Sequence, residues 1–454
     1  MMYYLAIDIG ASSGRPMLSW LADGKMRLQE VYRFYNGMDQ VDGHLCWDVG
    51  RLFAEIVAGM KECKKIGKIP TSMGIDTWAV DYVLLDDKDQ VLGNTYAYRD
   101  SRTDGMDALV YEKIPQEDLY ARTGIQKQIF NSIYQLMAHK TQEAELLGKA
   151  KTFLMIPDYF HFLLTGVKKQ EYTNASTTQL VNAKTNDWDY DLIAKLGYPR
   201  DIFLPIEMPG TEGFDCSVVL PATHDTGAAV MAVPSLSDDT LYISSGTWSL
   251  MGTELKTANC SPDSMACNFT NEGGYDHRYR YLKNIMGLWM IQSVRKELSP
   301  DEEFGSICEH AATETITSIV DANDDRFLAP QNMTAEVQAA CRESGQKVPE
   351  GIYQVAAVIY NSLAKCYADT VREIEKIEHV TYPCINIVGG GANAAYLNEL
   401  TAKATGKTVY AGPTEATAIG NIMAQMIAAG ELQDLAEARK CVFHSFEIKE
   451  EKGC

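Results

Sequence analysis

Three turns built from glycine and other small residues stand out, and each follows a short apolar run. They read GASSG at 10–14, SSGT at 244–247 and GGG at 389–391. A glycine turn after a strand lets backbone N–H groups approach a ligand closely, and phosphate oxygens are its natural occupants. Taken alone, the first two turns are better explained as ordinary hairpins. The triple glycine is more informative, because its conformational entropy must be offset by close packing or by a ligand.

None of the three turns carries a standard nucleotide-binding signature. A P-loop requires G-x-x-x-x-G-K-[ST], which these turns do not match. The segment GGGANA at 389–394 also differs from the G-x-G-x-x-G fingerprint with its acidic residue about 20 positions on. A Rossmann dehydrogenase is therefore disfavoured.

A carboxylate at the start of a helix is the second candidate for chemistry. The segment THDTGAAVMAVP at 223–234 predicts a helix with Asp225 or Thr226 as its N-cap. A carboxylate held there is also well placed to accept a proton from a bound hydroxyl. The structural and the catalytic interpretations do not exclude each other.

Other chemistries receive less support from the residue spacing. Asp76 and Asp81 could form a glycosidase pair, but their odd spacing on a strand predicts opposite faces. The eight histidines show no H-x-x-x-H spacing. The eleven cysteines are odd in number and contain no C-x-x-C pair, which favours reduced thiols over disulfides or a zinc site.

Alternating strand and helix patterns would position these residues. Strand patterns occur at 3–9, 16–21, 72–87, 241–252 and from 384, and helical patterns occur at 49–66, 352–377, within 384–406 and at 415–430. Pro16 cannot donate to a ladder, so the second strand is expected to start there or to present an edge there. The alternation predicts the α/β class.

The length of 454 residues predicts two large lobes. A polar connection near 233–240 separates two halves that each open on a strand, a turn of small residues and a strand. The 46% hydrophobic and 22% charged composition is typical of a globular protein. We therefore expect domains at 1–235 and 236–454.

The net charge of −20 opposes a nucleic acid partner. A small anionic ligand would need backbone N–H groups, Mg²⁺ or a few basic side chains to meet its charge. The sequence has neither a basic segment before an apolar signal core nor a run of 18 apolar residues. A cytoplasmic protein with no membrane partner is expected.

Ten segments, in colinear order from about residue 4 to about 425, resemble the FGGY family of carbohydrate kinases. They are DIGASSGR (8–15), GIDTWAVDYVLLD (74–86), YRDSRT (98–103), EYTNASTTQL (171–180), HDTGAAV (224–230), YISSGTWSLMG (242–252), TNEGG (270–274), LKNIMGLW (282–289), IVGGGAN (387–393) and AGPTEATAIGNI (411–422). The resemblance implies two actin-like ATPase lobes of the ribonuclease H type, with ATP and sugar in an inter-lobe cleft. Domain 1–235 would carry the sugar side and the first phosphate motif, and domain 236–454 the nucleotide side.

The resemblance also implies roles for individual residues. Nucleotide-binding roles fall on Ala11, Ser12, Ser13, Gly14, Arg15, Thr247, Gln292, Gly389, Gly390 and Gly391. Substrate-binding roles fall on Trp78, Ala79, His224, Asp225, Thr226 and Asn284. Asp225 would also receive the proton of the sugar hydroxyl, and Asp8 would hold Mg²⁺ through water.

The implied reaction is ATP-dependent phosphorylation of a ketohexose at its C1 hydroxyl, with L-rhamnulose as the expected substrate. L-Fuculose is the nearest rival, because the two ketoses differ only in stereochemistry. The branch of the family that the chain resembles usually has glycine where this chain has Ala79, which leaves the preferred ketose open. A nucleotide-dependent sensor without kinase turnover is the alternative from another class, and the oligomeric state stays open.

Overall fold

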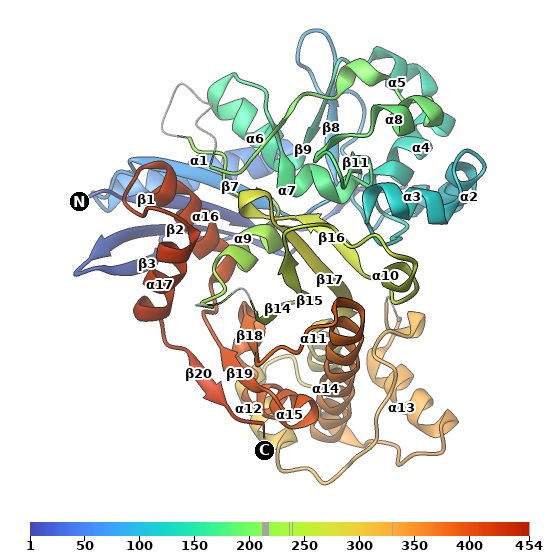
Figure 1. Ribbon diagram of the computed structural model, residues 1–454, viewed down its shortest axis with the longest axis vertical. Helices are drawn as coiled ribbons and strands as arrows, with labels where there is room; N and C mark the ends of the chain where they lie inside the picture. Colours follow the sequence, from blue (N-terminus) through green and yellow to red (C-terminus); the bar gives the residue numbers. More distant parts are fainter. Residues whose placement is uncertain (211–217, 236, 238, 329, 454) are drawn as a thin grey trace. The chain divides into compact units, whose positions relative to one another are not determined.

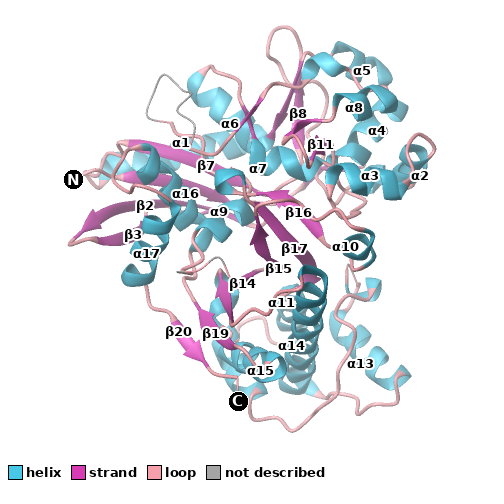
Figure 2. Ribbon diagram, in the orientation of Figure 1, coloured by secondary structure: helices cyan, strands magenta, loops and turns pink. Residues whose placement is uncertain are grey.

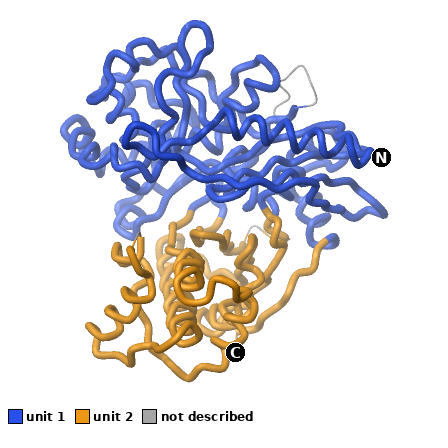
Figure 3. Tube along the Cα trace, turned by 180° about the vertical axis from the view of Figure 1, so that it is seen from behind, with its two compact units in different colours: residues 1–232, 254–281, 417–445 blue, residues 233–253, 282–416, 446–454 orange. Residues whose placement is uncertain are grey.

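The computed structural model describes residues 1–210, 218–235, 237, 239–328 and 330–453, and it divides into two compact units (Figure 3). Unit 1 comprises residues 1–232, 254–281 and 417–445, and unit 2 comprises residues 233–253, 282–416 and 446–454. Each unit is thus assembled from three separate segments of the chain. Helices and strands alternate through both units (Figure 2), which confirms the expected α/β class.

The central sheet of unit 1 is built from the first strands of the chain. They are β1 (Tyr4–Ile9), β2 (Ser13–Ala22), β3 (Lys25–Glu30), β4 (Phe34–Tyr35) and β7 (Ser72–Thr77). The strand order is β3-β2-β1-β7, and β4 also pairs with β2. Strand β1 runs antiparallel to β2 and parallel to β7.

Alternation along β1 separates an apolar face of this sheet from a face that carries carboxylates. Leu5 and Ile7 belong to a hydrophobic core shared with helices α1 (Val49–Lys65) and α6 (Ile156–Thr165). Because successive side chains of a strand point to opposite faces, Asp8 points to the other face. Helix α16 (Ala416–Ala428) covers that face (Figure 1), where Asn421 donates to Asp76.

Strand β2 begins at Ser13, so the expectation that it starts at Pro16 is wrong. The alternative expectation, that the strand presents an edge there, is closer to the structure. β4 pairs with Ser13 and Gly14, and β3 pairs from Met17 onward. The carbonyl of Pro16 accepts from Val31 at 3.0 Å on that side. The missing N–H of proline therefore falls where one pairing partner of β2 ends and the next begins.

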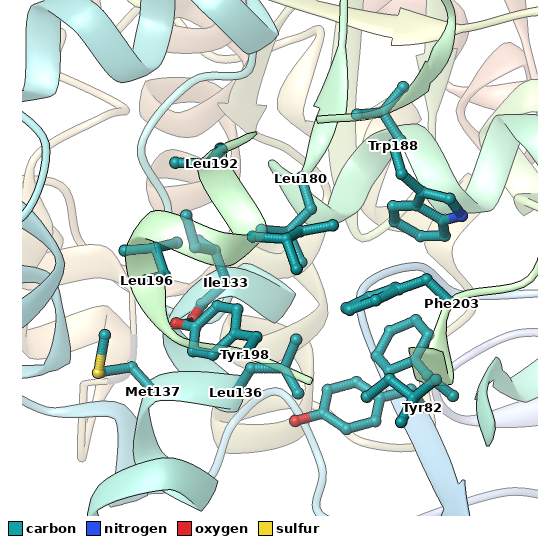
Figure 4. Packing of buried hydrophobic residues seen from close by; sticks show 14 of the residues in the cluster. Tyr82, Ile133, Leu136, Met137, Leu180, Trp188, Leu192, Leu196, Tyr198 and Phe203 are labelled. Carbon is teal, nitrogen blue, oxygen red and sulfur yellow. Dashed lines mark hydrogen bonds between the residues drawn. The ribbon is translucent and has the colours of Figure 1, made fainter. Parts of the chain in front are cut away.

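A second hydrophobic cluster of unit 1 lies among helices and short strands beyond the sheet (Figure 4). These and the other elements of the unit are β5 (Asp39–Val41), β6 (His44–Cys46), β8 (Tyr82–Leu85), α2 (Met106–Tyr111), α3 (Gln116–Thr123), α4 (Ser132–Gln142), α5 (Ala144–Lys149), β9 (Thr152–Met155), β10 (Gln170–Glu171), α7 (Tyr172–Ala175), β11 (Val181–Asn182), β12 (Asp187–Trp188), α8 (Tyr190–Leu196), β13 (Ile206–Glu207), α9 (Asp225–Met231), α10 (Pro262–Ala266), β16 (Thr270–Gly273) and α17 (Leu435–Ser445). The strand pattern at 72–87 is thus two strands, β7 and β8, separated by the segment 78–81.

Unit 2 repeats the arrangement of a hairpin beside a parallel strand. Its elements are β14 (Leu241–Ser245), β15 (Trp248–Leu255), β17 (Tyr279–Met286), α11 (Trp289–Leu298), α12 (Phe304–Ala311), α13 (Met333–Glu343), α14 (Gly351–Glu378), β18 (Cys384–Val388), α15 (Ala395–Thr405), β19 (Thr408–Ala411) and β20 (Lys449–Glu451). Residues 254–255 of β15 and 279–281 of β17 are assigned to unit 1. The strand order is β17-β15-β14-β18-β19-β20. β14 is antiparallel to β15 and parallel to β18, as β1 is to β2 and β7. The two similar strand-turn-strand units expected from the sequence are present.

Helix α14 is the longest helix described, and it packs against α11, α12 and α15. One side of it is continuously buried, as the apolar stripe at 352–377 predicts. No helix within the described ranges combines the length and the apolar character needed to cross a membrane.

Candidate functional site

Asp225 is the first residue of α9, and the N-cap is His224. The expectation that Asp225 or Thr226 is the N-cap is therefore wrong by one or two positions. The Asp225 carboxylate accepts from the backbone N–H of Thr226 at 2.5 Å and from its hydroxyl at 3.1 Å. Loss of solvation raises the pKa of Asp225 to about 7, and the nearby charge of Asp8 adds to the rise. Its side chain is 32% exposed, so a hydroxyl group can reach it.

The segment before α9 is held by one buried carboxylate, Glu171. Its Oε2 accepts from the backbone N–H of Thr223 at 3.1 Å and from the Thr223 hydroxyl at 2.7 Å. The same oxygen accepts from the Thr173 hydroxyl, which in turn accepts from the His224 N–H at 3.2 Å. The carbonyl of Thr223 accepts from Thr77 N–H at the end of β7. The position of α9 relative to the central sheet is therefore fixed by buried hydrogen bonds.

His224 is buried between an arginine and the candidate base. Its Nδ1 lies 2.9 Å from Arg280 Nη2, and its Nε2 lies 3.4 Å from Asp225 Oδ1. Burial, and then the positive charge of Arg280, hold the pKa of His224 well below its usual value. The imidazole is therefore neutral at physiological pH. Thr226, on the first turn of α9, is also buried.

Asp8 lies near the end of β1 in a group of three ionisable side chains, of which Asp8 and Asp76 are buried and Arg15 is partly exposed. Arg15 Nη2 donates to Asp8 Oδ2 at 2.8 Å, and Asp76 occupies the position beside Asp8 on β7. Burial raises the pKa of Asp8, and burial together with the Asp8 charge raises that of Asp76 well above its usual value. Asp76 Oδ2 accepts from Asn421 at 2.6 Å. The structure thus brings Asp8 and Arg15 together and adds Asp76, which was considered only for a glycosidase pair.

The turn between β1 and β2 closes through a hydrogen bond from Gly10 N–H to the Ser13 carbonyl. Ser12 at its tip is exposed, and Ala11 is half-buried. A Cβ on Gly14 would lie 2.0 Å from the Phe34 ring, so packing already requires glycine at that position. The short side chains of Ala11 and Ser12 would leave room for a ligand beside this turn.

The segment between β7 and β8 is anchored by Asp81. Its Oδ2 accepts from the indole N–H groups of Trp47 at 2.6 Å and Trp78 at 2.9 Å. Val80 has a φ of +66°, which is a strained conformation for a β-branched residue. Ala79 is half-buried on the surface of unit 1. The candidate sugar-binding segment is therefore a strained turn held by buried hydrogen bonds.

Thr247 lies in the turn of the β14–β15 hairpin of unit 2, against the start of α11. The Gly246 carbonyl accepts from Leu288 N–H, and the Thr247 carbonyl accepts from Trp289 N–H. Gln292 lies in the first turns of α11, where its N–H donates to the Leu288 carbonyl. The structure therefore brings Thr247 and Gln292 onto two elements that are hydrogen-bonded to each other.

The triple glycine follows β18 and packs against Ser245 at the end of β14. Gly389 has a φ of +85°, and a Cβ there would lie 2.9 Å from the Ser245 carbonyl oxygen. A Cβ on Gly391 would lie 1.8 Å from Ser245 Oγ. Gly390 is exposed, and a Cβ there would meet nothing within 4 Å. Two of the three glycines are thus explained by packing, and Gly390 leaves open space beside bare backbone.

The structure distributes the site residues between the two units. Unit 1 holds Asp8, the turn 11–15, Trp78, Ala79 and the segment 224–226. Unit 2 holds Asn284, Thr247, Gln292 and the segment 389–391. Asn284 lies half-buried on β17.

Four buried polar residues that support the site carry no role in the sequence interpretation: Glu171, Arg280, Asn421 and Gln425. Gln425 accepts from the Ser72 hydroxyl at 2.7 Å and donates to Asn421 at 2.8 Å. Two of them could have been found from the sequence, because Asn421 and Gln425 stand four residues apart in the largely apolar helix α16. Buried amides at that spacing imply hydrogen-bond partners across the helix interface.

Sequence profiles of one family cover both halves of the chain. The profile of the FGGY family of carbohydrate kinases, N-terminal domain, matches residues 3–234, and that of the C-terminal domain matches residues 241–429. The chain belongs to the FGGY family of carbohydrate kinases, which confirms the resemblance of its ten segments. Membership implies the use of ATP.

Similar proteins cover nearly the full length of the chain. A rhamnulokinase of Oceanobacillus iheyensis is 49% identical, with 98% of this chain and 97% of the relative covered. A rhamnulokinase of Bacillus subtilis is 44% identical, with 99% of this chain and 95% of the relative covered. Among solved structures, a ligand-bound xylulose kinase from Lactobacillus acidophilus superposes with a TM-score of 0.78 at 16% identity, covering 100% of this chain and 94% of that one. The glycerol kinase of Plasmodium falciparum with ADP superposes with a TM-score of 0.77 at 14% identity, covering 100% of this chain and 95% of that one. These two structures confirm the kinase fold.

Proposed function

We propose that the protein transfers the γ-phosphoryl group of ATP to the C1 hydroxyl of L-rhamnulose. The observation that carries the proposal is the Asp225 carboxylate, partly exposed at the start of α9 with a pKa raised to about 7. The names of the relatives at 49% and 44% identity support rhamnulose as the sugar. ADP and L-rhamnulose 1-phosphate would be the products.

Asp225 acts as the general base in this proposal. The transition state of phosphoryl transfer is loose, so alignment of the hydroxyl and neutralisation of oxygen charge provide most of the catalysis. The C1 oxygen forms a bond to the γ-phosphorus, the bond from phosphorus to ADP breaks, and the hydroxyl proton moves to Asp225. A carboxylate with a pKa near 7 suits this step, because about half of the molecules carry it ionised at neutral pH and it accepts a proton readily.

The nucleotide is assigned to the three turns of small residues and to Gln292. The exposure of Ser12 and Gly390 supports the assignment, and a Cβ on Gly390 would meet nothing within 4 Å. The Arg15 guanidinium, 24% exposed beside Asp8, adds positive charge for phosphate in a chain of net charge −20. Thr247 lies at a hairpin turn whose backbone is fixed by α11.

Asp8 is assigned to Mg²⁺, and the residues around it fit a hard cation. The carboxyl groups of Asp8 and Asp76 offer only oxygen atoms as metal ligands, and Asp76 Oδ1 receives no hydrogen bond from the described residues. No three Asp, Glu, His or Cys side chains in the described ranges group in a way that could hold a metal alone. Mg²⁺ commonly uses one or two carboxylates together with substrate phosphates. When bound, it would neutralise charge on the transferring phosphoryl oxygens.

The sugar is assigned to Trp78, Ala79, His224, Thr226 and Asn284. The Asp81 hydrogen bond to Trp78 and the strained Val80 support a rigid wall for the ketose. The added methyl group of Ala79 would fill space where the branch of the family that the chain resembles usually has glycine. L-Fuculose is the second candidate, because stereochemistry alone separates it from L-rhamnulose.

The substrate is tested by measuring kcat/KM for L-rhamnulose, L-fuculose, L-xylulose and glycerol with ATP, following ADP release. The expected result is a clear preference for L-rhamnulose, with ³¹P NMR placing the phosphate of the product on C1. A preference for L-fuculose would overturn the assignment of the ketose. ATP turnover that is independent of any sugar would instead favour the nucleotide-dependent sensor.

A further inference from the structure

A fully buried arginine lies behind His224 and makes three directed contacts. Arg280 Nε donates to the Gly273 carbonyl at 2.8 Å, and Nη1 lies 3.0 Å from Glu272 Oε2. Nη2 lies 2.9 Å from His224 Nδ1. The Arg280 side chain has no solvent exposure, so its orientation is set by these partners. All four residues belong to unit 1.

This contact decides which nitrogen of His224 carries the proton. A guanidinium group has only donors, so the Nδ1 atom that faces Arg280 must be an acceptor. A neutral imidazole with a lone pair on Nδ1 carries its hydrogen on Nε2. The Nε2–H then lies on the side of Asp225 Oδ1, 3.4 Å away.

The competing arrangement places a proton on Nδ1 and directs it to Glu272 Oε2, 3.4 Å away. That arrangement would bring two hydrogen atoms together between Nδ1 and Arg280 Nη2 at the shorter distance of 2.9 Å. A doubly protonated imidazolium, the third possibility, would place a second positive charge beside the guanidinium in a buried site, which is also unfavourable. The acceptor role of Nδ1 is therefore favoured by both sterics and charge.

We propose that Arg280 is a positioning residue that fixes His224 as the Nε2–H tautomer, so that an N–H group faces the Asp225 carboxylate and the substrate hydroxyl beside it. The Nε2–H stabilises the ionised form of Asp225, which is the form that accepts the proton. The other tautomer would present a lone pair to the same carboxylate and repel it. The catalytic consequence rests on the proposed kinase function, whereas the tautomer itself does not.

The tautomer is tested in the wild-type protein by long-range ¹H–¹⁵N correlation NMR with ¹⁵N-labelled histidine, and the His224 signals are assigned by their loss in His224→Gln. The expected result is a protonated Nε2 and an unprotonated Nδ1 from pH 6 to pH 8. A protonated Nδ1, or an imidazolium at pH 7, would overturn the proposal. Because this measurement needs no sugar, its failure is distinct from a failure to phosphorylate L-rhamnulose.

The role of Arg280 is tested with Arg280→Met and a matched control, Arg439→Met. Arg439 is also a buried arginine of unit 1, paired with Glu254 at 2.6 Å and donating to the carbonyls of Val230 and Met231 at the other end of α9. Arg280→Met should lower kcat by about 10-fold to 100-fold with little change in the KM for ATP, and the fixed tautomer should be lost. Arg439→Met should lower Tm but keep both kcat and the tautomer.

Retention of the Nε2–H tautomer and of full kcat in Arg280→Met would overturn the proposal. If the single variant does not fold, Arg280→Met combined with Glu272→Met removes both charges of the buried pair and serves the same comparison. Loss of kcat to the same extent in Arg439→Met would show that only general stability matters, and it would also overturn the proposal.

Discussion

Asp8 and Asp76 occupy the same register position on the adjacent parallel strands β1 and β7. Both carboxyl groups are buried, and burial raises the pKa of Asp8 although the Arg15 charge opposes the rise. The pKa of Asp76 is raised well above its usual value by burial and by the Asp8 charge, so Asp76 carries the proton of the pair. Arg15 Nη2 donates to Asp8 Oδ2 at 2.8 Å and so favours the ionised form of Asp8 in the pair.

Asp76→Asn should make folding less dependent on pH. In the folded wild type Asp76 keeps its proton above the pKa of the unfolded chain, so the folded state binds more protons. Stability of the wild type should therefore fall as pH rises from the usual aspartate range toward the raised pKa. The asparagine variant imitates the protonated acid and should lose this slope. Urea unfolding at several pH values in EDTA measures it, and an unchanged slope would contradict the protonated Asp76.

Gly390→Ala and Gly391→Ala should separate nucleotide binding from packing. The new Cβ at 391 would lie 1.8 Å from Ser245 Oγ and should cost about 1–3 kcal/mol of stability. The new Cβ at 390 meets nothing within 4 Å, so stability should change by less than about 0.5 kcal/mol while the KM for ATP rises. Thermal unfolding and steady-state kinetics measure both. An unchanged KM in Gly390→Ala would show that the nucleotide does not approach that backbone.

Arg102→Met should affect stability and leave sugar binding intact. Arg102 is buried, pairs with Glu143 at 3.0 Å, approaches His139 Nδ1 at 3.3 Å and lies 3.7 Å from the centroid of the Tyr96 ring. These contacts show a buried ion pair at Arg102. Its loss should cost about 3 kcal/mol, measured by urea unfolding. Arg99→Met, at an exposed neighbour, is the control and should be near neutral; a large rise in the KM for sugar in Arg102→Met alone would contradict the structural role.

The sequence was sufficient for the strands, helices and turns whose signals are local. The apolar runs at 3–9 and 241–252 and the stripe at 352–377 correspond to β1, to the β14–β15 hairpin and to α14. The place of Pro16 inside β2 could not be predicted from neighbouring residues, because its missing N–H is tolerated by the arrangement of β3 and β4 around β2. That arrangement depends on pairing between distant segments of the chain.

The supporting residues of the candidate site could not be predicted, because their roles depend on contacts over long sequence distances. Asn421 reaches Asp76 across 345 positions, and Arg280 reaches His224 across 56. Glu171 binds Thr223 in the same way across 52 positions. The N-cap at His224 was missed because the usual preference for Asp or Thr competes with tertiary hydrogen bonds that begin α9 one residue earlier.

The kinetics of Asp225→Asn test the central claim most directly. Asparagine keeps the shape of the side chain and can still accept from Thr226, but it cannot take up a proton. We predict that kcat with L-rhamnulose and ATP falls by about 10²- to 10⁴-fold, while ATP binding measured by calorimetry is nearly unchanged. The wild-type kcat/KM should rise with pH through about 7, because the base must be ionised, and the variant should lack this rise. Near-normal turnover in Asp225→Asn would contradict the assignment of Asp225 as the group that accepts the hydroxyl proton.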